Sequence, residues 1–115
     1  MIVGIGIDII EVERVARLAG KSPRFLERTF TPREIAYCSP KRNEFQNYAA
    51  RFAAKEAFFK ALGGRIGWTD VELVNRPSGQ PELVVKGRAR WPFDRAHVSI
   101  SHLAAYAVAV VVLEK

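Results

Sequence analysis

The longest unbroken pattern in the chain runs from Glu44 to Leu62 and predicts a single helix. Alanine is frequent there, neither glycine nor proline interrupts it, and Gly63-Gly64 follow where helices commonly stop. At 100° per residue, one apolar arc of this helix collects four aromatic side chains: Phe45, Tyr48, Phe52 and Phe59. Glu56 falls at the edge of this arc, where a charge needs a partner.

Lys60 is the nearest candidate partner for Glu56, because residues four apart meet on the surface of a helix. The simplest interpretation is an intrahelical ion pair without a role in function. The alternative is that both side chains belong to a site, and only the rest of the chain can support it.

The first ten residues, MIVGIGIDII, alternate as a strand does. Val3, Ile5, Ile7 and Ile9 share one face, and the other face carries Gly4 and Gly6 just before Asp8. Glycine inside a strand usually marks a close approach of another backbone or of a ligand. Either a helix packs over these glycines and Asp8 caps the helix that follows, or Asp8 is a ligand; the same carboxylate can do both.

Short helices are predicted next, over Glu11 to Ala19 with a stop at Gly20, and over Arg24 to Phe30. Thr31, Pro32 and Glu34 form a capping box that begins a helix ending near Tyr37.

The second half of the chain is mostly extended. Strands over 70–74 and 82–85 flank the turn 75–81 and predict a hairpin, and an irregular basic segment covers 86–95. HVSISH alternates over 97–102, and YAVAVVVL at 106–113 predicts a strand buried on both faces. The order predicts an α+β fold, with a mainly antiparallel sheet and one domain over residues 1–115.

Composition and charge narrow the class of protein. The first nine residues are apolar except for Asp8 and are too short to span a bilayer. The lone Cys38 has no partner for a disulfide or zinc site. We therefore expect a cytoplasmic protein that does not enter membranes. The net charge is +6, and residues 41–65 hold six basic and only two acidic side chains. This local excess suits a phosphate-rich ligand, a nucleic acid or an acidic protein.

Asp8, Glu56 and the basic cluster around the long helix suggest one shared site. Two carboxylates with few His or Cys companions suit Mg²⁺, which keeps water ligands and takes phosphate oxygens as well. Lys60 would then neutralise a phosphate bound to the same metal.

Three motifs strengthen this hypothesis: GIGIDIIEVERV at 4–15, RFAAKEAFFKALG at 51–63 and VSISH at 98–102, with the turn NRPSGQP between the last two. Together and in this order they resemble the holo-acyl-carrier-protein synthase family of 4′-phosphopantetheinyl transferases. The resemblance implies Mg²⁺-dependent transfer of 4′-phosphopantetheine from coenzyme A to a serine of apo acyl carrier protein, with release of adenosine 3′,5′-bisphosphate, in the service of fatty acid biosynthesis. It also implies a long central helix packed on the sheet.

The resemblance assigns site residues as well. Asp8 and Glu56 match the Mg²⁺ ligands, and with Lys60 and His102 they make up the catalytic set. It implies a homotrimer whose active sites lie between subunits, and an arginine face that meets the acidic carrier protein at Arg14, Arg24 and Arg28. The residues expected at coenzyme A are Lys41, Arg42, Arg51, Lys60, Gly63, Gly64, Arg65, Ser101 and His102.

One position departs from the family pattern, and one role stays open. The family usually has Gly-x-Gly after the helix, whereas this chain has Gly63-Gly64-Arg65-Ile66-Gly67, so Arg65 either adds a phosphate contact or shifts the loop. The general base is open among Glu56, a metal-bound water and another acid.

Two other functions fit less of the sequence. A module that binds single-stranded nucleic acid would expose aromatic side chains among its basic ones, but the phenylalanines here are at core spacing. A Mg²⁺ nuclease with two metals would need more acidic ligands.

Overall fold

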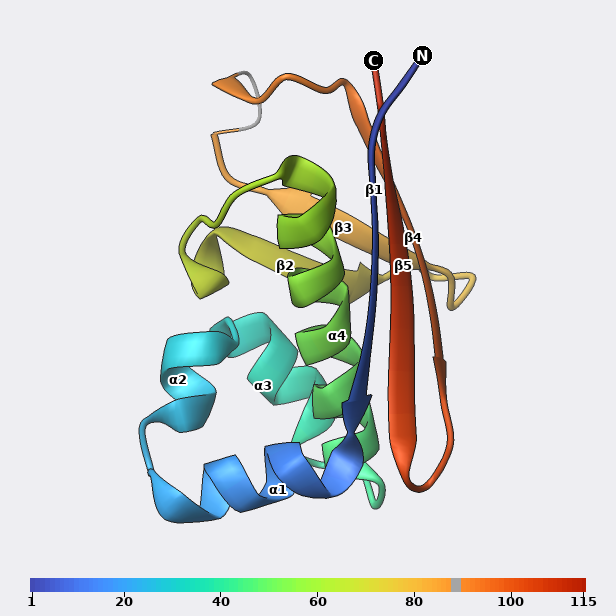
Figure 1. Cartoon of the computed structure of the whole chain (residues 1–115). Helices are drawn as coiled ribbons and strands as arrows, with labels where there is room; N and C mark the ends of the chain where they lie inside the picture. The colour runs from blue at the N-terminus through green and yellow to red at the C-terminus, as the bar shows by residue number, and fades with distance from the viewer. Residues whose placement is uncertain (88–89) are drawn as a thin grey trace.

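The computed structural model describes residues 1–87 and 90–115; part of the predicted irregular segment, residues 88 and 89, lies outside the described residues. The fold is α+β, as predicted, and Figure 1 shows its arrangement. The elements in chain order are β1 (Ile2–Glu11), α1 (Val12–Lys21), α2 (Phe25–Thr29), α3 (Pro32–Cys38), α4 (Glu44–Leu62), the 3-10 turn η1 (Trp68–Asp70), β2 (Val71–Asn75), β3 (Pro81–Val85), β4 (Arg95–His102) and β5 (Tyr106–Glu114).

The strands form two antiparallel sheets. One has the order β1-β5-β4, and the other is the predicted hairpin of β2 and β3. In the larger sheet the two ends of the chain lie together, and α4 runs along one face (Figure 1). The Glu44–Leu62 prediction for α4 is confirmed at both ends, and Gly63 ends the helix in the left-handed conformation, at φ 78°.

β1 lies unusually close to α4 because of its glycines. A Cβ on Gly4 would overlap the carbonyl oxygen of Ala61, and one on Gly6 would overlap that of Ala57. Small residues on both elements therefore let the two backbones touch. This confirms the close approach that the glycines predicted, and the neighbour that approaches is the helix itself.

α4 is buried around most of its circumference, not only along the predicted aromatic arc. Residues 48–55 are all buried in succession, and Phe58, outside that arc, is buried against Phe93. The reason is that several elements pack against the helix: the three strands of the larger sheet, and also α1, α3 and β2.

An ion pair with no exposed surface crosses the core between α4 and α3. Lys55 Nζ lies 2.6 Å from Glu34 Oε1, and both side chains are 0% exposed. Lys55 also donates to the carbonyl oxygens of Thr29 and Trp68, and Glu34 accepts from the backbone N–H groups of Thr31 and Leu73. Each charge is thus surrounded by hydrogen-bond partners, which is the condition for burying it.

Three sequence-based predictions are wrong in detail. Asp8 does not cap the first helix, because Glu11 occupies the N-cap position without a side-chain hydrogen bond. The helix continues through Gly20 to Lys21, because glycine permits a stop without requiring one. β5 is not buried on both faces: its residues alternate between buried and half-buried, because α4 covers only one face of the sheet.

The face of the sheet turned away from α4 is apolar and exposed. Val3, Ile5, Ile7 and Ile9 are 43%, 67%, 61% and 65% exposed. The register places Ile5, Ile7 and Ile9 opposite Val112, Val110 and Val108 of β5, so the apolar surface continues across both strands. Among the described residues, none of the helices has the length and apolar character that crossing a membrane requires.

The contact between β1 and α4 gives a test of stability. Gly6→Ala should lower the free energy of unfolding by about 3 kcal/mol, because the new methyl group meets a backbone carbonyl that cannot rotate away. Gly20→Ala is the matched control, since its Cβ would meet no atom within 4 Å. Because alanine favours a helix more than glycine does, this variant should raise the free energy of unfolding by about 0.5 to 1 kcal/mol. Urea unfolding of both variants decides the point, and equal midpoints would contradict it.

Candidate active site

Charged side chains from β1 and α4 meet beside the glycine contact. Lys60 Nζ lies 3.2 Å from Asp8 Oδ1 and donates a second hydrogen bond to the carbonyl oxygen of Ile7, at 2.9 Å. The Asp8 side chain is 17% exposed and that of Lys60 is 54% exposed. Asp8 points toward α4 because it follows Gly4 and Gly6 on the same face of β1.

Glu56 has a different partner from the one its spacing suggested. Arg65, in the loop after α4, places its two terminal nitrogens 3.3 to 3.4 Å from the carboxylate oxygens of Glu56. The simple interpretation, an ion pair between Glu56 and Lys60, is therefore wrong. Each of the two α4 side chains has its partner elsewhere: Lys60 in β1 and Glu56 in the loop.

Burial raises the pKa of Asp8 above its usual value of 3.8. The hydrogen bond and the positive charge of Lys60 lower this pKa, the negative charge of Glu56 raises it further, and the positive charge of Arg14 on α1 lowers it.

These residues fit a divalent cation with oxygen ligands. Asp8 and Glu56 are hard, partly exposed carboxylates on neighbouring elements. Within residues 1–87 and 90–115 there is no group of three or more His, Cys, Asp and Glu side chains that would hold a metal alone. A cation held by two carboxylates must complete its shell with water or phosphate oxygens, as Mg²⁺ does.

His102 lies apart from this group within the chain. Its Nδ1 is hydrogen bonded to Oε1 of Gln46, at 2.9 Å, in the first turn of α4. Gln46 and Lys60 are fourteen residues apart, which is about 21 Å along a helix. Asp8 and His102 also lie on the two outer strands of the sheet, with β5 between them.

Arg51 and Lys41 gather around Tyr37 on α3. Their cationic groups each lie 4.3 Å from the centre of the Tyr37 ring. Arg51 is 2% exposed and donates to Asn75 Oδ1, at 2.8 Å, while its Nε has no hydrogen-bond partner among the described residues. The structure thus joins Arg51 to the hairpin and not to Asp8 or Glu56.

The other predicted residues lie at the surface. Gly63 and Gly64 close the helix, and their N–H groups donate to the carbonyl oxygen of Phe59. Arg42 and Ser101 are exposed. The predicted docking arginines are exposed too: Arg14 on α1, Arg24 just before α2 and Arg28 within α2.

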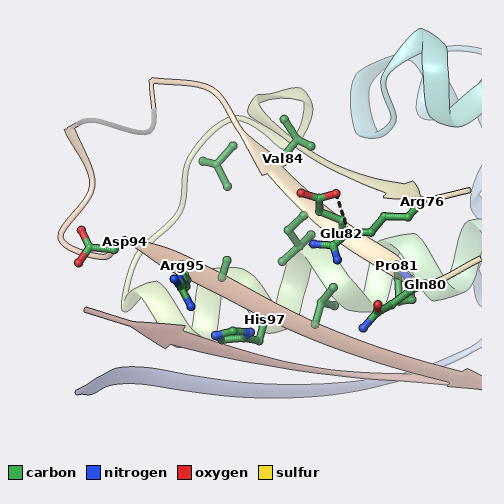
Figure 2. Close-up of a pocket in the computed structure, with 12 residues that line it drawn as sticks. Arg76, Gln80, Pro81, Glu82, Val84, Asp94, Arg95 and His97 are labelled. Atoms are coloured by element: carbon green, nitrogen blue, oxygen red, sulfur yellow. Dashed lines mark hydrogen bonds and ion pairs between the residues drawn. The ribbon is translucent and has the colours of Figure 1, made fainter. Parts of the chain in front are cut away.

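A separate groove lies between β3 and β4. Figure 2 shows its lining, with Arg76 paired to Glu82 and with Arg95 and His97 on the neighbouring strand. Its volume is about 640 Å³. No residue predicted for the site lines this groove, although Arg76, Gln80 and Pro81 of the NRPSGQP turn do.

Several contacts at the site carry no signal in the sequence. Gln46, Tyr37 and Asn75 hold His102 and Arg51 in place, and none of them stood out as a site residue. Their partners are 14 to 56 residues away in the chain, a separation at which local patterns say nothing. Arg65 is an exception, because its position in a glycine-rich loop already indicated a possible phosphate contact.

The chain matches known proteins over a range that includes every predicted site residue. The family model of the 4′-phosphopantetheinyl transferase superfamily matches residues 4–111. The chain is 50% identical to a holo-[acyl-carrier-protein] synthase of Geobacter sulfurreducens, over 100% of this chain and 99% of the relative. It is 47% identical to one from Koribacter versatilis, over 99% of each.

Solved structures agree with the sequence relatives. The crystal structure of a holo-(acyl-carrier-protein) synthase from Bacillus anthracis in complex with CoA (3′,5′-ADP) has a TM-score of 0.88 and 39% identity, over 100% of this chain and 98% of that one. The synthase of Neisseria meningitidis has a TM-score of 0.91 and 33% identity, over 100% of both chains.

Asp8 gives a test of the electrostatics in metal-free buffer. Because the folded chain holds the Asp8 proton more tightly than the unfolded chain, this carboxyl favours folding at low pH, and the contribution is lost as pH rises through the raised pKa. Asp8→Asn has no such loss. Its free energy of unfolding, relative to that of the wild type, should therefore rise between pH 3 and pH 7 in urea titrations with EDTA. A relative fall would show that attraction by Lys60 outweighs burial.

Proposed function

The chain belongs to the 4′-phosphopantetheinyl transferase superfamily, and from this premise we propose that it transfers 4′-phosphopantetheine from coenzyme A to a serine of apo acyl carrier protein. Residues 1–115 make up one transferase domain. The observation that carries the proposal is the meeting of Asp8, Glu56 and Lys60, two carboxylates and a lysine held together by the contact between β1 and α4.

The reaction needs a site that stabilises negative charge. The serine oxygen forms a bond to the β-phosphorus of coenzyme A, and the bond from that phosphorus to the bridging oxygen breaks, with its electron pair staying on that oxygen. The hydroxyl proton passes to a general base and from there to water. Adenosine 3′,5′-bisphosphate leaves and the product is a phosphodiester. The partner supplies the nucleophile, so this chain needs no nucleophile of its own, and its task is to bind, orient and neutralise.

Asp8 and Glu56 would hold Mg²⁺, which supplies a positive charge to the diphosphate when it is bound. Lys60 reaches the same place from α4, and its side chain is 54% exposed, so it can exchange Asp8 for a phosphate oxygen. The backbone carbonyl of Ile7 keeps one donor of Lys60 engaged and fixes its direction.

The remaining residues proposed for coenzyme A form a second half of the site. They belong to the end of β4, to the first half of α4 and to the residues before α4: His102, Ser101, Lys41, Arg42 and Arg51. If two copies meet side by side, this half of one can complete the Asp8 half of the next. We therefore propose a homotrimer with shared sites, in which Gly63, Gly64 and Arg65 line the Asp8 half.

The exposed face of β1 and β5 supports assembly. Val3, Ile5, Ile7, Ile9 and Tyr106 are 43% to 67% exposed, and single copies rarely leave a continuous apolar face in water. A cyclic trimer would cover this face and leave α1 and α2 outside, with their arginines open to a partner.

The carrier protein would approach over α1 and α2. Arg14 lies near enough to Asp8 to affect its pKa, so a partner held by Arg14, Arg24 and Arg28 would arrive beside the metal ligands. An acidic surface is the complement of these arginines, and charge of this kind mainly speeds association and sets orientation.

Transfer can be measured directly. With coenzyme A, Mg²⁺ and an apo acyl carrier protein, the carrier should gain the mass of one phosphopantetheine in intact-protein mass spectrometry. Glu56→Gln should lower kcat/KM at least about 100-fold, because a metal ligand is lost, and should leave the thermal midpoint close to that of the wild type. Absence of the mass gain, with an active control transferase in the same assay, would refute the proposal.

The assembly can be tested by light scattering after size exclusion. The wild type should have about three times the 12.9 kDa mass of the chain. Ile7→Asp puts a charge at the centre of the exposed face and should reduce the mass to that of one chain. Val84→Asp, on an exposed residue of β3 outside this face, should remain trimeric. A single-chain mass for the wild type would contradict the trimer.

A further inference from the structure

The pairing of Arg65 with Glu56 is more than a loose surface contact. The guanidinium also lies 5.4 Å from the ring centre of Phe59 and 5.9 Å from that of Trp68. Phe59 is 4% exposed and the two rings pack edge to face, so Arg65 rests on a rigid aromatic surface. Its charged group is therefore held over Glu56 from two directions.

The loop that carries Arg65 is fixed to the helix at both ends. Gly63 turns in the left-handed conformation, and the N–H groups of Gly63 and Gly64 donate to Phe59, which reverses the chain over the last turn of α4. Beyond Arg65, the carbonyl oxygen of Trp68 accepts from the buried Lys55. These backbone contacts fold the loop back along α4, and this brings Arg65 beside Glu56, nine residues earlier in the chain.

The formal charge of the four side chains at this place is zero. Asp8 and Glu56 contribute two negative charges, and Lys60 and Arg65 contribute two positive ones. A bare divalent cation would have to displace or face these positive groups, whereas a cation that arrives with a diphosphate brings anionic oxygens to which they can move.

We propose that Arg65 is a resident counter-ion of Glu56 that keeps the carboxylate from holding a divalent cation alone, and that it exchanges Glu56 for a phosphate oxygen when metal and diphosphate arrive together. This inference rests on the proposed function, because it takes Glu56 as a metal ligand. The exchange replaces two ion pairs within the chain with carboxylate–metal and cation–phosphate contacts, and no charge is left unpaired.

The consequence is coupling between the two ligands. If coenzyme A removes Arg65 from Glu56, it raises the affinity for the metal, and by linkage the metal raises the affinity for coenzyme A by the same factor. A chain without the arginine should bind the metal more tightly when no coenzyme is present, and should show less coupling. A merely structural arginine would change neither quantity.

The test is a titration of the full chain with Mn²⁺, in which free Mn²⁺ is counted by electron paramagnetic resonance at low ionic strength, with and without coenzyme A. We expect Arg65→Ala to bind Mn²⁺ alone about five- to tenfold more tightly than the wild type, since an exposed cation beside the ligand is removed. The gain in affinity on adding coenzyme A should shrink by at least the same factor. Arg65→Lys keeps the charge and should lie near the wild type.

Arg33→Ala is a matched control. Arg33 pairs with Glu72 at 3.2 Å with side chains 68% and 17% exposed, against 3.3 Å, 64% and 18% for Arg65 and Glu56. It should leave Mn²⁺ binding unchanged. Equal or weaker Mn²⁺ binding by Arg65→Ala, in a chain whose wild type binds Mn²⁺ with coenzyme A, would overturn this inference alone. If neither protein bound Mn²⁺ with coenzyme A, the proposed metal site would fail and the inference with it.

Discussion

The contact between β1 and α4 is the constraint on which the site depends. Gly4 and Gly6 meet the carbonyl oxygens of Ala61 and Ala57, so the strand and the helix are as close as two backbones can be. Asp8, the next residue on that face, therefore enters the reach of Lys60 without a long side chain. A larger residue at either glycine would move Asp8 outward, and the pair would lose its geometry before the fold lost its topology.

Two adjacent residues of α4 lie in different surroundings, one in the core and one at the rim of the proposed site. Lys55 points into the core, where Glu34 and two carbonyl oxygens hold it, and Glu56 points 100° away to the rim where Arg65 covers it. Because Lys55 also holds the carbonyl of Trp68, the loop bearing Arg65 is fixed by the interior. Lys55 thus takes part both in the buried ion pair and in fixing the loop that places Arg65 over Glu56.

The charges at the site favour a divalent cation that arrives together with an anionic diphosphate over a divalent cation alone. Each carboxylate has a cation beside it, and burial already raises the pKa of Asp8 despite Lys60. In the proposed exchange, a diphosphate with its metal would replace both partners with groups of the same charge, whereas a lone divalent cation would replace neither cation. Within one chain, Asp8 and His102 lie on the two outer strands of the larger sheet, with β5 between them, and His102 is hydrogen bonded to Gln46 of α4.

The sequence by itself determined the elements, because they depend on local periodicity and local capping. It predicted α4 from Glu44 to Leu62, the capping box at Thr31, the hairpin and the close approach at Gly4 and Gly6. Its motifs also indicated the family before any contact was known. Tertiary structure alone decided the partners: Lys60 pairs with Asp8, 52 residues away, and not with Glu56. Spacing along a helix shows which side chains can meet, but the charge that is nearest after folding depends on how strand, helix and loop pack together.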